Sequence, residues 1–172
     1  MNAYEELQTI EGLRPANVYS VNANYLFLQK YMLSLFYERT NDYFTMDMYQ
    51  AKDRLALVYR TQNWDYYQSF GMSANVPFNI GEWLSSQVNA TVVNDRNRCD
   101  NFWDIPFDRK KWACMLAMQN HFSVGSNLGF DLDAMYRSSM ISGISDTKPV
   151  FTVNVGAQWN FLKDKASLSL NC

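Results

Sequence analysis

The strict alternation of apolar and polar residues in Val150–Leu170 constrains the fold of this chain more than any other feature. From position 151 to position 160 (FTVNVGAQWN), every odd-numbered residue is apolar and every even-numbered residue is polar or glycine. Successive side chains of a β-strand point to opposite faces, so the segment predicts a strand with one apolar and one polar face. A short turn at 162–165 and a second alternating run from Ala166 complete a β-hairpin.

Similar alternation predicts eight antiparallel strands that follow one another along the chain. Their expected ranges are 18–28, 31–48, 55–78, 83–94, 111–122, 127–138, 151–161 and 166–172. In the third strand, Asn63, Trp64 and Asp65 indicate either a turn between two strands or a bend within one. We choose the bend, because all short turns then fall on one side of the sheet. A β-bulge there would explain why the apolar positions change parity within the strand.

The connections differ in length between the two ends of the predicted sheet. Short turns at 29–30, 79–82, 123–126 and 162–165 alternate with longer excursions at 49–54, 95–110 and 139–149. This asymmetry is typical of outer-membrane β-barrels, and strands of roughly 9 to 11 residues are long enough to cross a bilayer. Aromatic residues flank the short turns, as in a membrane-interface girdle: Phe27, Tyr31, Phe78, Trp83, Phe122, Trp159 and Phe161. The pattern therefore favours an all-β, antiparallel transmembrane barrel over a soluble β-sandwich.

Length and composition fit one membrane-embedded domain. The 172 residues suffice for a single domain, which we expect to comprise a leading loop at 1–16 and a partial barrel at 17–172. A net charge of -2 gives no reason to expect a nucleic-acid partner. The start of the chain has no apolar segment of the signal-peptide type. Cys99, Cys114 and Cys172 match neither a zinc motif nor a disulfide framework, and we expect no metal or other cofactor.

No group of residues predicts an enzyme. His121 is the only histidine, and no nucleophile elbow, second base or metal-ligand spacing accompanies it, so we expect no catalytic residues. Asp131, Asp133 and Arg137 share the polar face of one predicted strand. They would line the barrel interior, either contacting a solute or an internal plug, or forming ion pairs in a wetted interior.

The charged excursion at 95–110 contains the other candidate site. Phe102 and Trp103 lie there among acidic and basic residues. Such a mixture can bind sugars or peptides at the outer mouth of a barrel, and it equally suits a loop folded against its neighbours.

Three segments resemble a known family, the Bacteroidetes outer-membrane β-barrel family related to TonB-dependent receptors. They are EGLRPANVYSVNANY at 11–25, YMLSLFYERTNDY at 31–43 and FLKDKASLSL at 161–170. The resemblance covers roughly residues 11–171 and implies a barrel of about 22 strands with a plug in its lumen, acting as a transporter. It implies an outer-membrane location, a role in nutrient uptake, and lipid, a plug domain and the TonB system as partners.

We expect this chain to form only the C-terminal part of such a barrel, because it shows no plug or TonB-contacting segment and ends without a terminal aromatic residue. Two alternatives remain open. One is a small eight-stranded outer-membrane barrel of structural role, which requires closure between the first and last strands. The other is a soluble β-sandwich that binds an apolar ligand.

Overall fold

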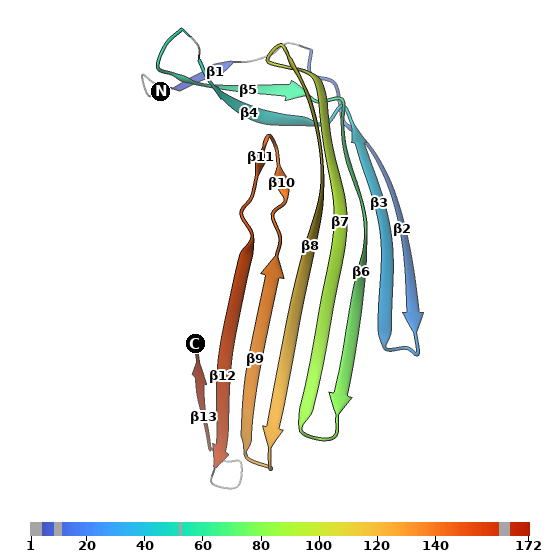
Figure 1. The fold of residues 1–172 in the computed structure, drawn as a ribbon, viewed down its shortest axis with the longest axis vertical. Helices are drawn as coiled ribbons and strands as arrows, with labels where there is room; N and C mark the ends of the chain where they lie inside the picture. The colour runs from blue at the N-terminus through green and yellow to red at the C-terminus, as the bar shows by residue number, and fades with distance from the viewer. Residues whose placement is uncertain (1–4, 9–11, 52, 162–165) are drawn as a thin grey trace.

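The computed structural model describes residues 5–8, 12–51, 53–161 and 166–172, which form β-strands joined by turns and short irregular segments (Figure 1). In chain order the strands are β1 (Glu5–Gln8), β2 (Asn17–Phe27), β3 (Tyr31–Asn41), β4 (Phe44–Gln50), β5 (Leu57–Asn63), β6 (Tyr66–Ile80), β7 (Leu84–Phe102), β8 (Ile105–Val124), β9 (Leu128–Arg137), β10 (Ile141–Ser142), β11 (Ser145–Asp146), β12 (Val150–Phe161) and β13 (Ala166–Asn171). No helix in the described ranges is long and apolar enough to span a membrane.

Eight strands form one curved antiparallel sheet, in the order β13-β12-β9-β8-β7-β6-β3-β2 (Figure 1). The predicted meander of eight strands is therefore confirmed. In the described residues the sheet is open, with β2 at one edge and β13 at the other. Three further strands, in the order β1-β5-β4, make a small sheet beyond one end, and β10 and β11 pair only with each other.

One face of the eight-stranded sheet is apolar and exposed. Residues directly opposite each other in paired strands lie on the same face of a sheet. The strand registers therefore show which residues of all eight strands share this face. Leu33, Val153 and Leu168, which the alternation assigns to the apolar side, all lie on this face and are 41%, 46% and 62% exposed. No other part of the described chain covers them. A surface of this kind is stable against lipid and unfavourable in water.

Two bands of aromatic residues bound this apolar face. The band beside the short turns, which the sequence predicts, contains Phe27, Tyr31, Phe78, Phe122 and Trp159. A second band, which the sequence analysis missed, lies on the same face at Tyr37, Phe70, Trp112, Tyr136 and Phe151. The eight residue steps from Phe151 to Trp159 span roughly 21 to 27 Å depending on strand tilt, which matches the apolar belt of outer-membrane barrels.

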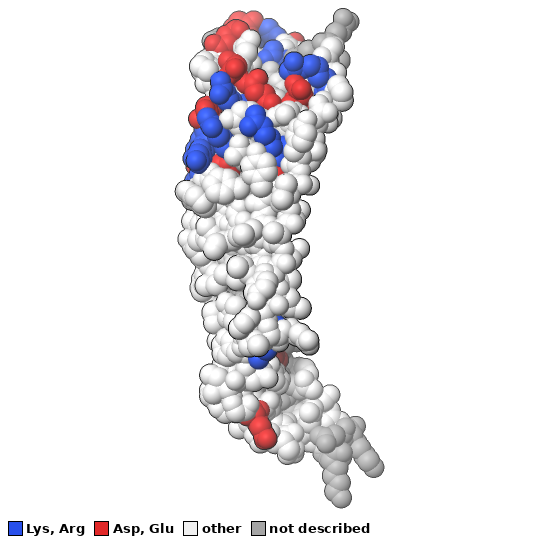
Figure 2. Space-filling view, turned by 90° about the vertical axis from the view of Figure 1, so that its right-hand side faces the viewer, with Lys and Arg blue, Asp and Glu red and all other residues white. Residues whose placement is uncertain are grey.

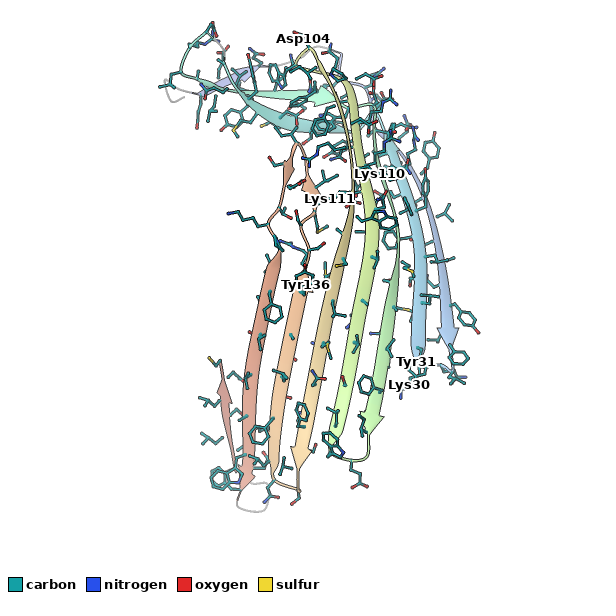
Figure 3. The ribbon with its side chains drawn as sticks, viewed as in Figure 1. Lys30, Tyr31, Asp104, Lys110, Lys111 and Tyr136 are labelled. Carbon is teal, nitrogen blue, oxygen red and sulfur yellow. The ribbon has the colours of Figure 1, made fainter. Side chains whose placement is uncertain are left out.

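Charged side chains gather beyond the second band. Figure 2 shows Lys, Arg, Asp and Glu concentrated at one end of the molecule, with a broad band nearly free of charge below them. Figure 3 places Lys110 and Lys111 beyond Tyr136, Asp104 at the far tip, and Lys30 and Tyr31 at the opposite end. By the rule that outer-membrane barrels have short periplasmic turns, the charged end faces outward from the cell.

The predicted bend at Asn63–Asp65 exists, but its geometry differs from a bulge. The expected strands 31–48 and 55–78 both break, into β3 and β4 and into β5 and β6. Two residues leave the ladder on each side: Asp42 N donates to Asp65 O (3.1 Å), and Trp64 N donates to Tyr43 O (2.6 Å). Because the interruption is symmetric, both strands turn together, and β4 and β5 continue as part of a separate sheet.

The predicted loop at 95–110 is wrong. β7 and β8 continue through it to a two-residue turn at Trp103 and Asp104, which adopt positive φ angles of 53° and 66°. The alternation disappears there because both faces of the hairpin carry polar or charged residues, joined by pairs such as Arg96 with Asp108. The predicted loop at 139–149 contains the short pair β10 and β11.

The small outer sheet is anchored by a buried tryptophan and a buried carboxylate. Trp64 is 0% exposed, and its indole Nε1 donates a hydrogen bond to Asp47 Oδ2 (2.7 Å). Gln62 Nε2 donates to the same oxygen (3.1 Å). Burial is the largest influence on this carboxyl and raises the pKa of Asp47 above its ordinary value, although both donors oppose the shift.

Replacing Val155 with Arg should destabilise the protein by about 2 to 4 kcal/mol in lipid vesicles, because position 155 lies midway between Phe151 and Trp159, at the middle of the apolar belt. Asn154→Arg, one position along on the polar face, is the matched control and should cost much less. Urea titrations of the vesicle-inserted protein measure both free energies of unfolding. Equal costs for the two variants would contradict the assignment of the faces.

Asp47→Asn should change how stability depends on pH. The folded protein binds the Asp47 proton more tightly than the unfolded chain, so stability from this group is complete below about pH 3.8 and falls as pH rises through the raised folded pKa. The variant lacks this loss. The difference in Tm, variant minus wild type, should therefore increase between pH 4 and pH 7 in parallel melts. A constant or decreasing difference would show that burial does not penalise the ionised carboxylate.

Candidate functional site

The second face of the main sheet is polar and concave, and it contains a hollow of about 270 Å³ near the short turns. The hollow extends from the β2–β3 turn to β9, which requires the sheet to curve toward this side. Its lining includes Lys30, Asn79, Gln87, His121, Asp131 and Asp133. These amides, carboxylates and the amine are hydrogen-bonding groups open to solvent. They could bind a solute or a protein segment that is itself rich in hydrogen-bonding groups.

The structure brings together two of the three residues predicted to line the interior. Asp131 and Asp133 both border this hollow, and Asp131 Oδ1 lies 2.6 Å from His121 Nδ1. Arg137 lies at the other end of β9, and its Nε is buried without a hydrogen-bond partner. The partner of Asp131, His121, was not predicted from the sequence. The register of β8 and β9, which places His121 opposite Asp131, is what identifies it.

Phe102 and Trp103, the candidates at the outer mouth, take part in packing. Phe102 contacts the buried Trp64 ring edge-on, with centroids 5.6 Å apart. Trp103 packs against Tyr49, with centroids 3.9 Å apart, and the Arg60 guanidinium lies 3.6 Å from its ring centre. These contacts hold the β7–β8 turn against β4 and β5. They show a folded loop, with a hollow of about 450 Å³ beside it that both aromatic residues line.

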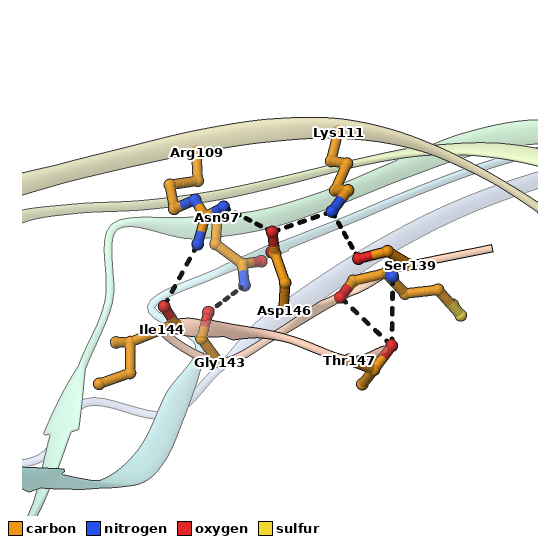
Figure 4. Close-up of polar contacts among 9 residues, drawn as sticks. Asn97, Arg109, Lys111, Ser139, Gly143, Ile144, Asp146 and Thr147 are labelled. Carbon is orange, nitrogen blue, oxygen red and sulfur yellow. Dashed lines mark hydrogen bonds and ion pairs between the residues drawn. The ribbon is translucent and has the colours of Figure 1, made fainter. Parts of the chain in front are cut away.

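A third polar cluster lies where the β10–β11 hairpin folds over the polar face of β7 and β8 (Figure 4). Asp146 Oδ2 accepts hydrogen bonds from Lys111 Nζ (2.9 Å) and Arg109 Nη2 (3.0 Å). Asn97 Nδ2 donates to the Gly143 carbonyl (3.2 Å). Lys111 Nζ also donates to Ser139 Oγ (2.7 Å). The alternation in the sequence gives no sign of this cluster, because all its residues except Lys111, the first residue of a predicted strand, lie in two segments predicted to be loops.

The structure also describes the residue types that bind metals or react as nucleophiles. Across those ranges, no group of three or more His, Cys, Asp or Glu side chains could hold a metal ion. Cys99, Cys114 and Cys172 are free thiols, of which Cys99 is buried. The candidate sites consist of hydrogen-bonding, charged and aromatic groups on a concave wall and at its outer rim.

Comparison with known proteins agrees with this geometry. No curated protein and no solved structure matches the chain. The model of a family described as the outer membrane protein beta-barrel family matches residues 11–172, which include the whole main sheet. Membership of this family excludes the alternative of a soluble β-sandwich and places the protein in the outer membrane. The chain belongs to the outer membrane protein beta-barrel family.

Proposed function

We propose that this chain forms the C-terminal part of the wall of a transport barrel of the TonB-dependent receptor type, which takes up a nutrient across the outer membrane. The observation that carries the proposal is the open edge of the main sheet. All eleven residues of β2 are exposed, and β2 pairs on one side only in the described structure. Backbone groups in the hydrocarbon layer must be paired, so a membrane-embedded sheet needs further strands or closure on itself.

The two edges of the sheet match poorly. β13 pairs with the half of β12 from Gly156 to Phe161, whereas β2 pairs with β3 along all eleven of its residues. Each edge strand has one free side in the described sheet, where further strands would pair in a barrel of about 22 strands.

The polar face supplies what the wall of a transport lumen requires. Asp131, Asp133 and His121 border a wetted hollow, and the outer rim carries charged and aromatic side chains. In this role the chain contacts a solute and a plug domain, and it does not alter the solute chemically. The TonB system is the expected partner on the periplasmic side.

A small eight-stranded barrel of structural role is the second candidate. It is favoured by the strand count of the main sheet, since eight is the smallest number found in bacterial outer-membrane barrels. This candidate requires β2 and β13 to be neighbours.

A cross-linking experiment separates the two candidates. Cysteines replace Asn24 on β2 and Ser169 on β13, both on the polar face, in a variant whose three native cysteines are alanine. A bismaleimide with a span of roughly two strand spacings is added to outer membranes that contain the protein. The control pair, Gln158→Cys with Ser169→Cys, joins directly opposite residues and should cross-link in either case.

The transport proposal predicts that the control pair cross-links and the Asn24–Ser169 pair does not, because many strands separate the two edges. Efficient cross-linking of Asn24→Cys to Ser169→Cys would show that the chain closes on itself, and the transport proposal would fail. Purification in mild detergent then tests the partners, since TonB should copurify with the protein when the plug domain that contacts TonB is present.

A further inference from the structure

The β10–β11 hairpin leaves the wall of the sheet and places one carboxylate between two cations. The ladder of β9 and β12 stops at Arg137 and Val150, just beyond the outer aromatic band. The intervening segment turns over the polar face of β7 and β8 (Figure 4). There Asp146 Oδ2 lies 2.9 Å from Lys111 Nζ and 3.0 Å from Arg109 Nη2.

Both cations belong to β8, a strand of the wall, and their side-chain hydrogen bonds go to the hairpin segment, at Ser139, Ile144 and Asp146. Arg109 and Lys111 are two residues apart on β8, so their side chains leave the same face. Their directly opposite residues on β7 are Asn97 and Asp95, both buried on the polar side. β7 and β8 together form the longest hairpin of the sheet, which gives the cations a rigid base.

Few carboxylates near Arg109 and Lys111 are available to pair with them apart from Asp146. The neighbouring basic residues Arg96 and Arg98 are already paired, with Asp108 at 2.5 Å and Asp100 at 2.9 Å. Asp95 faces the same side as Lys111, and its Oδ1 accepts a hydrogen bond from the Tyr67 hydroxyl (3.1 Å). If Asp146 moved away, Arg109 and Lys111 would outnumber the one remaining carboxylate.

The hairpin is short, and the ion pairs that hold it are exposed. β10 and β11 contain two residues each, and the pair is closed at its base by Thr147 N donating to Met140 O (2.8 Å). The side chains of Asp146, Arg109 and Lys111 are 34%, 39% and 28% exposed. Water and dissolved ions therefore reach the ion pairs, and exposed pairs of this kind contribute little to stability. An anion from solution can compete with Asp146 for the same donors.

We propose that Arg109 and Lys111, with the Asn97 amide beside them, form a binding site for an oxyanion, a carboxylate or phosphate group, at the outer mouth of the barrel. Asp146 is the resident occupant, and an external anion releases the hairpin by taking its place. Arginine and lysine supply the charge-assisted hydrogen bonds that such groups require. All residues of the site belong to this chain, so this proposal does not rest on the transport proposal.

The hairpin itself reports on the site. A nitroxide is attached at Ile144→Cys, in a variant whose native cysteines are alanine, and the protein is purified from outer membranes in mild detergent. Electron paramagnetic resonance follows label mobility during titration with potassium phosphate, potassium succinate or potassium chloride at constant ionic strength. Phosphate, succinate or both should mobilise the label at concentrations where chloride does not, and the difference between the first two identifies the preferred group.

Binding of radiolabelled phosphate and succinate to three charge variants supplies the second measurement. Asp146→Asn removes the competing carboxylate and should tighten binding of the preferred anion at least tenfold, whereas Lys111→Gln should weaken it at least tenfold. Asp108→Asn is the matched control, because Asp108 is an ion-paired aspartate on the other face of β8, and it should leave affinity unchanged. Equal mobilisation by chloride, or unchanged binding in Asp146→Asn, would overturn the proposal and leave the hairpin as a structural latch.

Discussion

The absence of water in the hydrocarbon layer is the constraint on which this structure depends. Every backbone N–H and C=O group at membrane depth must find a partner within the protein, so the strands remain in one continuous antiparallel ladder there. Apart from its two open edges, the described sheet breaks only beyond the outer aromatic band. β3 and β6 break after Asn41 and before Tyr66, β9 and β12 separate beyond Arg137 and Val150, and the irregularity in β7 follows Cys99. The small outer sheet and the β10–β11 hairpin lie where water can form hydrogen bonds with backbone N–H and C=O groups that leave the ladder.

The same constraint governs polar side chains on the lipid-facing side. Ser86 Oγ donates to Asn120 Oδ1 (2.8 Å), and Asn120 Nδ2 donates to the Leu132 carbonyl (3.0 Å), so both side chains are paired within the sheet. Asn94 is 1% exposed although its Nδ2 has no hydrogen-bond partner, and its two neighbours on this face, Phe70 and Trp112, pack edge-on with ring centroids 5.3 Å apart. Polar groups on this face are thus kept from the lipid. On the other face, water and charged side chains are tolerated and become candidates for binding.

The sequence predicts the part of the fold that the membrane dictates. In Val150–Phe161, lipid on one side and water on the other impose alternation, so the strand and its faces can be read directly. Where both faces of a strand contact water, the sequence shows no apolar–polar alternation. The outer half of the β7–β8 hairpin is therefore predicted as a loop. Gly71 shows a second limit: a Cβ there would lie 2.8 Å from Phe36 Cζ, a crowding that only the paired strands reveal. The partners of Asp131 and Asp146 likewise depend on register and on chain reversal, which composition does not encode.

Cysteine labelling along β12 tests the central claim, that these strands cross the outer membrane with one face on lipid. Single cysteines from Phe151 to Trp159, in the cysteine-free variant, are treated in outer membranes with a water-soluble and a lipid-soluble maleimide. The structure predicts strict alternation, with odd positions reacting with the lipid-soluble reagent and even positions with the water-soluble one. Equal reactivity of both sets toward the water-soluble reagent would mean that the apolar face is not in lipid, and the account would be wrong.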